Sequence, residues 1–315
     1  MLEPESLAAR RAVKEARLRR RRLIGAVVAL GLSASGIAAV VAVAQGGTKA
    51  RRAARPALAA EAQARVRALS VPKTAHVSAI DALGDANIRW LSAIGLPIYC
   101  GGPRGNEVAF TFDDGPGVYT HYAVKKLTAA HEHATFFVVG RSMNGWPGWL
   151  PKEAKLGAIG DHTSTHPVLT ELAPDAITSQ ITRTRDKIEN AIGQPIYLFR
   201  PPYGARNAVV DRIARRLGLL EIMWSVDSGD SLGADWSEII HKVEAGLHPG
   251  AIILMHENRG QTIRALTTLL PELQRRHLRS VSLPELFATD PPSVAQVERG
   301  GHGCAAAPPA TLTGG

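Results

Sequence analysis

Two short stretches of the chain carry carboxylates and imidazoles at spacings that suit a metal site. Asp113 and Asp114 begin the sequence DDGP, directly after the apolar run EVAFTF. Neighbouring residues on an extended chain point in opposite directions, so one carboxylate can bind a metal while the other faces a reacting water. His162 and His166 are four residues apart, which places two imidazoles on one face of a helical turn. Singly, DDG also makes a good turn and two histidines can be surface residues.

Further polar residues follow apolar runs downstream. Arg200 begins RPPYG, where two prolines fix the backbone and the guanidinium can hold a carboxylate. Asp230 ends the segment WSVDSGD, in which Asp227 is interpreted as structural, and His256 lies in AIILMHE. Each has a structural explanation by itself. Five successive strand ends with a carboxylate pair, a histidine pair, an arginine, an aspartate and a histidine together predict a metal site with an acid and a base.

The elements that must position these residues follow an alternating pattern. From residue 107 onward, short apolar runs alternate with longer amphipathic stretches, which is typical of an α/β fold with a parallel sheet or barrel. We predict a distorted, incomplete (β/α)7-8 barrel, with a flat sheet as the alternative. The predicted strands are Val108–Phe112, Ala134–Val139, Gly157–Asp161, Ile196–Arg200, Leu220–Asp227, Ala251–His256 and Arg279–Ser282. Predicted helices include Tyr119–His131, Pro174–Ile192 and Ala205–Leu217.

The N-terminal part has a different composition. Residues 23–44 contain no charge, and this length is enough to cross a hydrocarbon core. Eight Lys or Arg precede the segment and four follow it, so the positive-inside rule predicts a cytoplasmic N-terminus. We therefore predict a transmembrane signal anchor and a single-pass cell-membrane protein whose catalytic domain is extracellular. The sequence AVA at 42–44 leaves cleavage as a signal peptide, and hence secretion, as the alternative.

Charge and composition divide the rest of the chain. We predict a cytoplasmic basic tail over 1–22, a stalk and helical lead-in over 45–96, one catalytic domain over 97–290 and a flexible tail over 291–315. The net charge of +9 comes from residues 1–55, because residues 56–315 contain twenty-five Lys or Arg and twenty-five acids. A neutral body argues against a nucleic-acid partner, which needs clustered cations.

The chain has two cysteines, Cys100 and Cys304. In an oxidising compartment they can form an intramolecular disulfide that ties the C-terminal region to the domain. Two free thiols are the alternative. No CxxC or Cys/His spacing indicates a zinc ribbon.

The segments TFDDG, HTSTH, RPPYG and LMH resemble, in order and spacing, the motifs of the NodB-homology polysaccharide deacetylases, carbohydrate esterase family 4. The resemblance covers residues 107–286. It implies that a divalent metal, Zn²⁺ with Co²⁺ as the alternative, binds to three side chains: Asp114, His162 and His166. It also implies that Asp113 is the general base. Three protein ligands with open positions for water and substrate are what hydrolytic zinc requires.

The resemblance implies further roles around this metal. His256 would be the general acid that protonates the departing amine, with Asp230 orienting and charging it, and Arg200 would tether the base. The backbone N–H of Tyr203 would help to hold the oxyanion, and Leu254 would line the pocket for the acetyl methyl group.

One position departs from the family pattern. The family often has a tryptophan directly after the aspartate that aligns with Asp230, and this chain has Ser231. Either Trp224 or Trp236 fills that space, or the methyl pocket is wider. The preference for acyl group and substrate is therefore less defined than the catalytic chemistry.

The resemblance and the export segment together imply metal-dependent removal of acetyl groups from an extracellular acetylated polysaccharide. The substrate we favour is the N-acetylglucosamine of peptidoglycan or a related cell-wall glycan. The alternatives are an O-acetyl esterase on xylan-like glycans, a small-molecule amidohydrolase and a non-catalytic glycan-binding protein. The last would be expected to lack a metal ligand, the base or the acid, and the sequence retains all of them.

Overall fold

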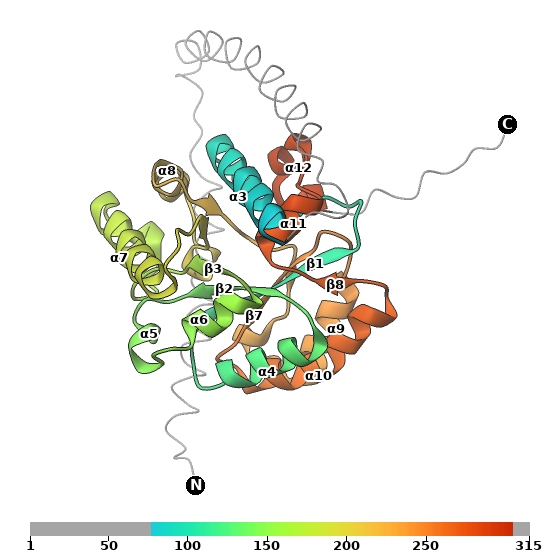
Figure 1. Ribbon diagram of the computed structural model, residues 1–315. Coiled ribbons are helices and arrows are strands. Elements are labelled where there is room, and N and C mark those ends of the chain that lie inside the picture. The colour runs from blue at the N-terminus through green and yellow to red at the C-terminus, as the bar shows by residue number, and fades with distance from the viewer. Residues whose placement is uncertain (1–76, 305–315) are drawn as a thin grey trace, which may run out of the picture. The chain divides into compact units, whose positions relative to one another are not determined.

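The computed structural model describes residues 77–304 of the 315-residue chain (Figure 1). The predicted basic tail, the membrane segment at 23–44 and most of the stalk lie outside the described residues. Within residues 77–304, no helix combines the length and the apolar character that crossing a membrane requires.

The described strands form one parallel sheet that curves into a half-barrel (Figure 1). The strands are β1 (Glu107–Gly115), β2 (Ala134–Val138), β3 (Gly157–Asp161), β4 (Leu198–Phe199), β5 (Leu220–Glu221), β6 (Val226–Asp227), β7 (Ile252–His256) and β8 (Arg279–Ser280). Seven of them follow the order β5-β4-β3-β2-β1-β7-β6, and β8 pairs with β1 beside this path. The prediction of an α/β fold with an incomplete parallel barrel is confirmed.

One predicted strand, Leu220–Asp227, is two strands in the structure. β5 pairs with β4 at one edge of the sheet, whereas β6 pairs with β7 at the other edge. The segment between them crosses from one edge to the other, so a single straight strand was the wrong prediction. Leu220 and Val226 are both buried, and the apolar pattern of the run does not mark the crossing.

Helices connect the strands. They are α3 (Val77–Ile94), α4 (Thr120–Ala130), α5 (Ser142–Gly145), α6 (Leu150–Glu153), α7 (Pro174–Ile192), α8 (Ala208–Arg216), α9 (Trp236–Gly246), α10 (Gly260–Arg275), α11 (Leu283–Thr289) and α12 (Val294–Arg299). The bounds predicted for α7 are confirmed, and α4 lies one residue inside its predicted range at each end. α8 begins later than predicted because Asn207 accepts hydrogen bonds from Val209 N and Val210 N and so caps the helix.

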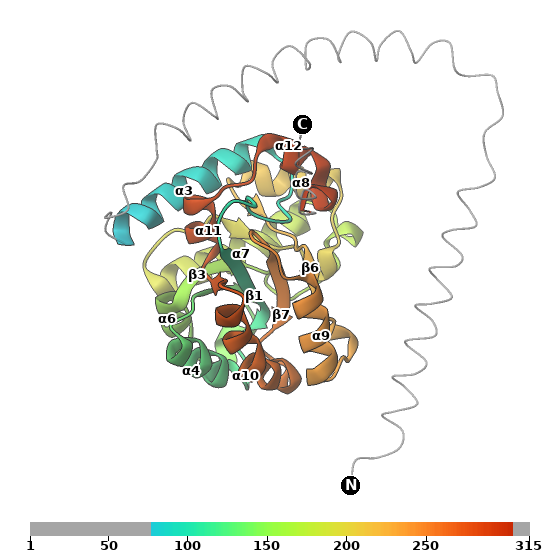
Figure 2. The same ribbon diagram turned by 90° about the vertical axis from the view of Figure 1, so that its right-hand side faces the viewer.

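Alternate residues along the strands face two different cores. Phe110 and Phe112 of β1 pack with Leu127 of α4 and Leu266 of α10 on the helix-covered side. Ala109, which precedes Phe110, belongs to the core on the inner side of the half-barrel, which α3 and α11 close at one end (Figure 2). Since side chains alternate along a strand, Thr111 and Asp113 also face this inner side. β1 thus delivers polar groups to the inside of the half-barrel and phenylalanines to its outer layer.

The folded part extends beyond the domain boundaries expected from composition. Upstream of residue 97, α3 packs against α11. Downstream of residue 290 the chain forms α12, and Cys304 is disulfide-bonded to Cys100. The intramolecular pairing of the two cysteines is therefore confirmed. Cys100 lies beside Ala251, just before β7.

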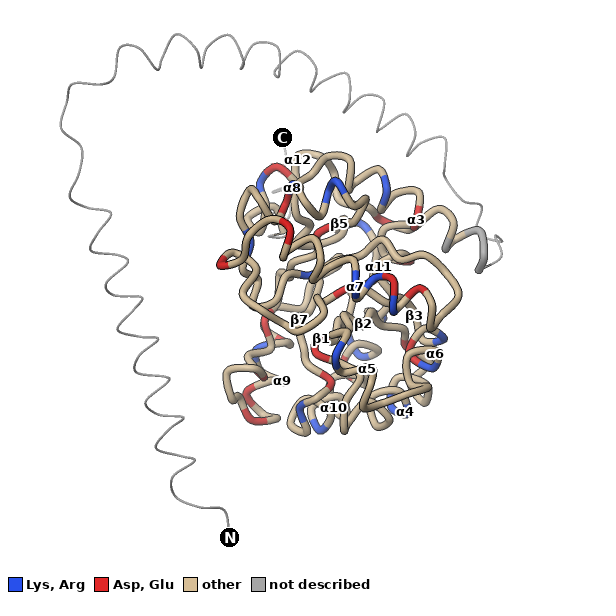
Figure 3. Tube along the Cα trace, turned by 90° about the vertical axis from the view of Figure 1, so that its left-hand side faces the viewer, with Lys and Arg blue, Asp and Glu red and all other residues tan. Residues whose placement is uncertain are grey.

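Charged residues of both signs are distributed along the described chain. In the view of Figure 3, Lys and Arg are interspersed with Asp and Glu over the helices and the loops between them. This mixed distribution is what a balanced count of acids and bases over residues 56–315 leads one to expect.

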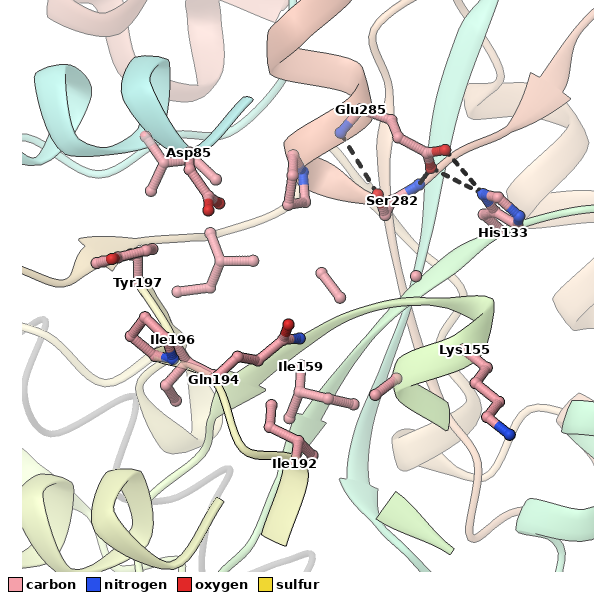
Figure 4. A pocket seen from close by; sticks show the side chains of 17 residues that line it. Asp85, His133, Lys155, Ile159, Ile192, Gln194, Ile196, Tyr197, Ser282 and Glu285 are labelled. Carbon is pink, nitrogen blue, oxygen red and sulfur yellow. Dashed lines mark hydrogen bonds and ion pairs between the residues drawn. The ribbon is translucent and has the colours of Figure 1, made fainter. Parts of the chain in front are cut away.

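A cavity of about 350 Å³ lies where β3 and β4 diverge (Figure 4). Its wall includes Gly157 and Ile159 of β3 and Leu198 of β4, with Asp85 of α3 and Glu285 of α11 on the other side. It adjoins the beginning of β3, whereas the polar motif HTSTH follows the other end of that strand. This cavity is therefore separate from the polar cluster described next.

Candidate metal centre and active site

The side chains singled out from the sequence meet at the carboxyl ends of the strands. β1 and β7 are parallel neighbours, and Asp113 is the register partner of His256. Adjacent strands lie about 4.8 Å apart, so the two residues stand side by side on the inner face. Asp161, the last residue of β3, leads into His162, and β4 leads into Arg200. One end of the half-barrel therefore carries every predicted catalytic and ligating residue.

A bulge in β1 separates the roles of the two aspartates. The register of β1 with β2 shifts between Asp113 and Gly115, which leaves Asp114 without a register partner. Asp114 has a φ of 73°, in the left-handed region. A bulge redirects a side chain at the end of a strand. As a result Asp113 is buried at 3% exposure, while Asp114 turns toward the histidines.

Three ligand atoms, from Asp114, His162 and His166, lie within 4.8 Å of one another. The Asp114 Oδ1 atom is 3.1 Å from His166 Nε2 and 3.8 Å from His162 Nε2. His162 Nδ1 lies 2.7 Å from the carbonyl oxygen of Arg200, which can only accept, so Nδ1 carries the hydrogen and Nε2 keeps its lone pair toward Asp114. Burial lowers the pKa of His162 to about 3, which holds the imidazole in its neutral, ligating form. Two imidazoles and one carboxylate in this arrangement fit a divalent cation.

The His162–His166 segment is not helical, so the expectation of a helical turn at this spacing is wrong. Thr163 and His166 have φ values of 69° and 61°. Asp161 Oδ1 accepts a hydrogen bond from Thr163 N at 2.7 Å, and Thr163 Oγ1 accepts one from His166 N at 3.1 Å. These side-chain bonds replace the hydrogen bonds of a helix and bring both rings to one side. The ring centroids of the two histidines are 4.9 Å apart.

Backbone strain is concentrated at this end of the barrel. Six non-glycine residues among those described have a positive φ, and four of them are Asp114, Thr163, His166 and Tyr203. The other two follow the ends of helices α4 and α10. Left-handed backbone costs on the order of 1 kcal/mol or more for a residue with a Cβ, and it persists where the surrounding structure enforces it. Its clustering here agrees with a functional site.

Arg200 holds Asp113 through a buried ion pair. The Arg200 side chain is fully buried, and its Nη1 donates to Asp113 Oδ1 and to Thr111 Oγ1, each at 2.8 Å. Its Nε and Nη2 donate to the carbonyl oxygens of Ile222 and Met223. Burial raises the pKa of Asp113, and the charge of Arg200 opposes that rise. The carboxylate is thus ionisable, fixed in orientation and more basic than an exposed aspartate.

His256 is held by Asp230 through two hydrogen bonds. His256 Nδ1 donates to Asp230 Oδ1 at 2.7 Å, and His256 N donates to Oδ2 at 2.7 Å. Thr262 Oγ1 adds a third donor to Oδ2 at 2.6 Å. Burial opposes protonation of His256, but the hydrogen bond and charge of Asp230 raise its pKa to about 9. His256 is therefore an imidazolium at neutral pH, next to the side chain of Asp113 on the neighbouring strand.

Comparison with known proteins agrees with this geometry. A family model described as polysaccharide deacetylase matches residues 101–222. The chain is 33% identical over 189 residues to a peptidoglycan-N-acetylglucosamine deacetylase of Bacillus cereus, and the alignment covers 58% of this chain and 69% of that protein. The chain belongs to the polysaccharide deacetylase family. This is carbohydrate esterase family 4, as its motifs implied.

Two further relatives define the extent of the match. The peptidoglycan-N-acetylglucosamine deacetylase PgdA of Listeria monocytogenes is 33% identical over 219 residues, which are 69% of this chain. The chain spans 46% of the length of that relative. The crystal structure of the Bc1960 peptidoglycan N-acetylglucosamine deacetylase superposes with a TM-score of 0.58 at 31% identity, covering 61% of this chain and 92% of that one.

The family motif RPPYG presents an exposed tyrosine to the candidate metal site. Tyr203 is 58% exposed, and its ring lies 4.6 Å, edge to face, from the ring of His166. Leu254 is buried at 5% on the inner face of β7, in register with Thr111 of β1. Both residues predicted to contact the acetyl group therefore lie toward the carboxyl end of the half-barrel.

The two tryptophans considered for the place of the usual family tryptophan lie in different surroundings. The ring of Trp224 lies 2.9 Å from the position that a Cβ on Gly204 would take, directly behind the RPPYG turn. Trp236 begins α9 and stacks under Arg264 on the outer helix layer. Ser231 is exposed. Of the two, Trp224 is the one next to an active-site loop.

Three polar residues near the site escaped the sequence analysis. Thr262, in the first turn of α10, contacts Asp230, and Asn258 Nδ2 approaches Asp114 Oδ2 at 3.4 Å. Glu257 is fully buried directly after β7. The sequence signal for Glu257 is its position directly after the motif LMH. A threonine or asparagine at the start of a helix is otherwise typical of ordinary capping chemistry.

Proposed function

We propose that this chain is a metal-dependent hydrolase that removes N-acetyl groups from N-acetylglucosamine units of peptidoglycan or a related cell-wall glycan. The observation that carries the proposal is the pairing of Asp113 and His256 on neighbouring strands, each held by a charged partner, beside the Asp114, His162 and His166 cluster. The relatives from Bacillus cereus and Listeria monocytogenes are peptidoglycan-N-acetylglucosamine deacetylases, which supports the choice of substrate.

The metal is expected to be Zn²⁺, with Co²⁺ as the alternative, bound by Asp114, His162 and His166. Such a cation supplies a Lewis acid that polarises the amide carbonyl and lowers the pKa of a water molecule. Asp113 accepts a proton from the water that attacks the carbonyl carbon, while Arg200 keeps the carboxylate aimed at it. The backbone N–H of Tyr203 donates to the oxygen that gains negative charge.

Collapse of the tetrahedral species breaks the C–N bond. His256 donates its Nε2 proton to the nitrogen as the bond breaks, which releases the free amine of the sugar and leaves acetate. Asp230 stays ionised throughout because three donors hold its carboxylate. An imidazolium whose pKa is about 9 suits an amide, since its amine leaving group needs a proton more than the alcohol of an O-acetyl ester does. This favours N-deacetylation over the alternative of O-acetyl ester hydrolysis on xylan-like glycans.

The test is acetate release from acetylated glucosamine oligomers and peptidoglycan, in the presence of Zn²⁺ or Co²⁺, with acetylxylan for comparison. We expect release from the amide substrates by the wild type, and losses of at least about a hundredfold in Asp113→Asn and His162→Ala. His241→Ala, which changes an exposed histidine on α9, is the matched control and should retain activity. Equal release by all four proteins would refute the assigned roles, no release by the wild type would leave a glycan-binding function, and preference for acetylxylan would support the esterase.

We also propose that residues 23–44 anchor the chain in the cell membrane with the catalytic domain on the extracellular side. The support is the uncharged length of the segment and the Lys and Arg that flank it. Fractionation of cells that express the full chain tests this. Activity in the membrane fraction and accessible to external protease is expected, and activity in the medium would instead indicate cleavage of the leader.

A further inference from the structure

Two fully buried glutamates lie behind the turn that carries Asp113 and Asp114. Glu153 ends α6, and Glu257 follows directly after β7. The two carboxyl groups are in hydrogen-bond contact with each other. Among the described residues, no other side chain or backbone group donates to either oxygen of Glu153 or to Oε1 of Glu257. The proposed mechanism uses neither residue.

Glu257 is linked to the turn by a short chain of hydrogen bonds. Its Oε2 accepts from Thr120 Oγ1 at 2.6 Å, and the same Oγ1 accepts from Gly117 N at 2.7 Å. Its Oε1 lies against Gly115, where a Cβ would collide with it. The carboxyl group of Glu257 thus bridges the end of β7 and residues 113–117, which form the end of β1 and the turn after it.

Two touching carboxyl groups in a buried site cannot both be ionised. Ionising both would place two negative charges a few ångströms apart in a medium that solvates them poorly. Two further acids, Asp113 and Asp114, also raise the pKa of Glu257. Burial raises the pKa of Glu153 well above its ordinary value and that of Glu257 to about 7.

We propose that Glu153 and Glu257 retain a shared proton at neutral pH, and that the resulting acid–carboxylate hydrogen bond makes both of them positioning residues for residues 113–117. The carboxyl group that holds the proton donates it to an oxygen of the other. The remaining oxygen of Glu257 then accepts a hydrogen bond from the hydroxyl group of Thr120, and that hydroxyl group accepts one from the backbone N–H of Gly117. The part of this inference that concerns catalysis rests on the proposed function, and the part that concerns the shared proton does not.

The shared proton is tested by the pH dependence of stability. A buried acid whose pKa is raised in the folded state binds more protons folded than unfolded, so the wild type loses stability as the pH rises above about 4.5. Glu153→Gln keeps the shape and donates to Glu257 through its amide at every pH. We expect its urea midpoint to match the wild type near about pH 5 and to exceed it increasingly toward about pH 8.

The exposed Glu171 provides the matched control, and Glu171→Gln should track the wild type at each pH. A gap between Glu153→Gln and the wild type that does not change with pH would exclude the shared proton. This measurement needs no substrate, so it tests the shared proton independently of the enzymatic activity.

The positioning role is tested by kinetics on an acetylated glucosamine oligomer. Glu153→Leu leaves Glu257 without its partner, and we expect kcat to fall about tenfold with KM unchanged, while Glu153→Gln restores kcat to within about threefold. If the leucine variant does not fold, Thr120→Val breaks the same chain of hydrogen bonds, and Thr120→Ser should rescue it. Equal kcat in the Val and Ser variants, or in the Leu and Gln variants, would overturn the positioning role. An inactive wild type would instead count against the proposed function.

Discussion

Replacing Asp230 with asparagine should move the basic limb of the pH profile of kcat to lower pH. The hydrogen bond and charge of Asp230 are the main reason that the pKa of His256 rises from 6.5 to about 9 against the opposing effect of burial. Asp113 and Asp114 add smaller contributions in the same direction. A pKa difference of about 2.5 corresponds to about 3 kcal/mol of preferential interaction with the imidazolium. The substitution keeps the volume of the side chain but removes its charge, and the burial of His256 remains. The pKa of His256 should therefore fall toward 6.5 in Asp230→Asn.

The consequence for activity depends on pH. At about pH 8, a group of pKa about 9 is about 90% protonated, whereas one of pKa 6.5 is about 3% protonated. If His256 must donate a proton, kcat at that pH should fall about 30-fold, and the loss should shrink toward about pH 6. Acetate release from an N-acetylglucosamine oligomer, measured as kcat from about pH 5.5 to about pH 9.5, gives both limbs in one series.

Asp227→Asn is the matched control because Asp227, at the end of β6 and three residues before Asp230, is exposed and accepts a hydrogen bond from Gly229 N rather than from His256. Its profile should coincide with that of the wild type. A basic limb for Asp230→Asn at the wild-type position would refute the reasoning, since the charge of Asp230 would then not be what keeps His256 protonated.

Three other perturbations follow from the same contacts. Asp113→Asn should lower kcat about 10²–10⁴-fold. It should also lower the free energy of unfolding, measured by urea titration, by about 3 kcal/mol, because it leaves the buried Arg200 without its counter-charge. Unchanged stability would contradict the ion pair. Zn²⁺ should raise the Tm of the chelator-treated wild type and restore its acetate release, but should do neither for His162→Ala. The double variant Cys100→Ser, Cys304→Ser should lose about 2–5 kcal/mol of stability and retain kcat, because the disulfide joins residues 204 positions apart beside the start of β7. A loss of kcat without destabilisation would contradict this expectation.

Local sequence patterns were sufficient for most elements and for the chemistry of the site. The apolar periodicity of Pro174–Ile192 predicted α7 with its observed bounds. The carboxylates and histidines could be found because each follows an apolar run, and the ends of parallel strands meet at one edge of a sheet. Both signals are local, since they depend on residues a few positions apart.

Other features depended on contacts between distant segments. The segment Leu220–Asp227 is split into β5 and β6 because its first residues pair at one edge of the sheet and its last residues pair at the other edge. The non-helical His162–His166 segment is held by backbone hydrogen bonds to other parts of the chain, from His162 N to the carbonyl oxygen of Val138 and from Ser164 N to that of Gln180. Neither is visible in periodicity, because hydrophobic patterns record that a residue is buried but not which residues surround it.

The sequence by itself determined which functional groups are present and on which strand ends they lie. Only the tertiary structure decided that Asp113 is in register with His256, that a bulge turns Asp114 toward the histidines, and that Glu153 meets Glu257. The physical reason is that register, bulges and buried pairs are set by packing between segments far apart in the chain, where one residue of shift exchanges the inner and outer faces of a strand.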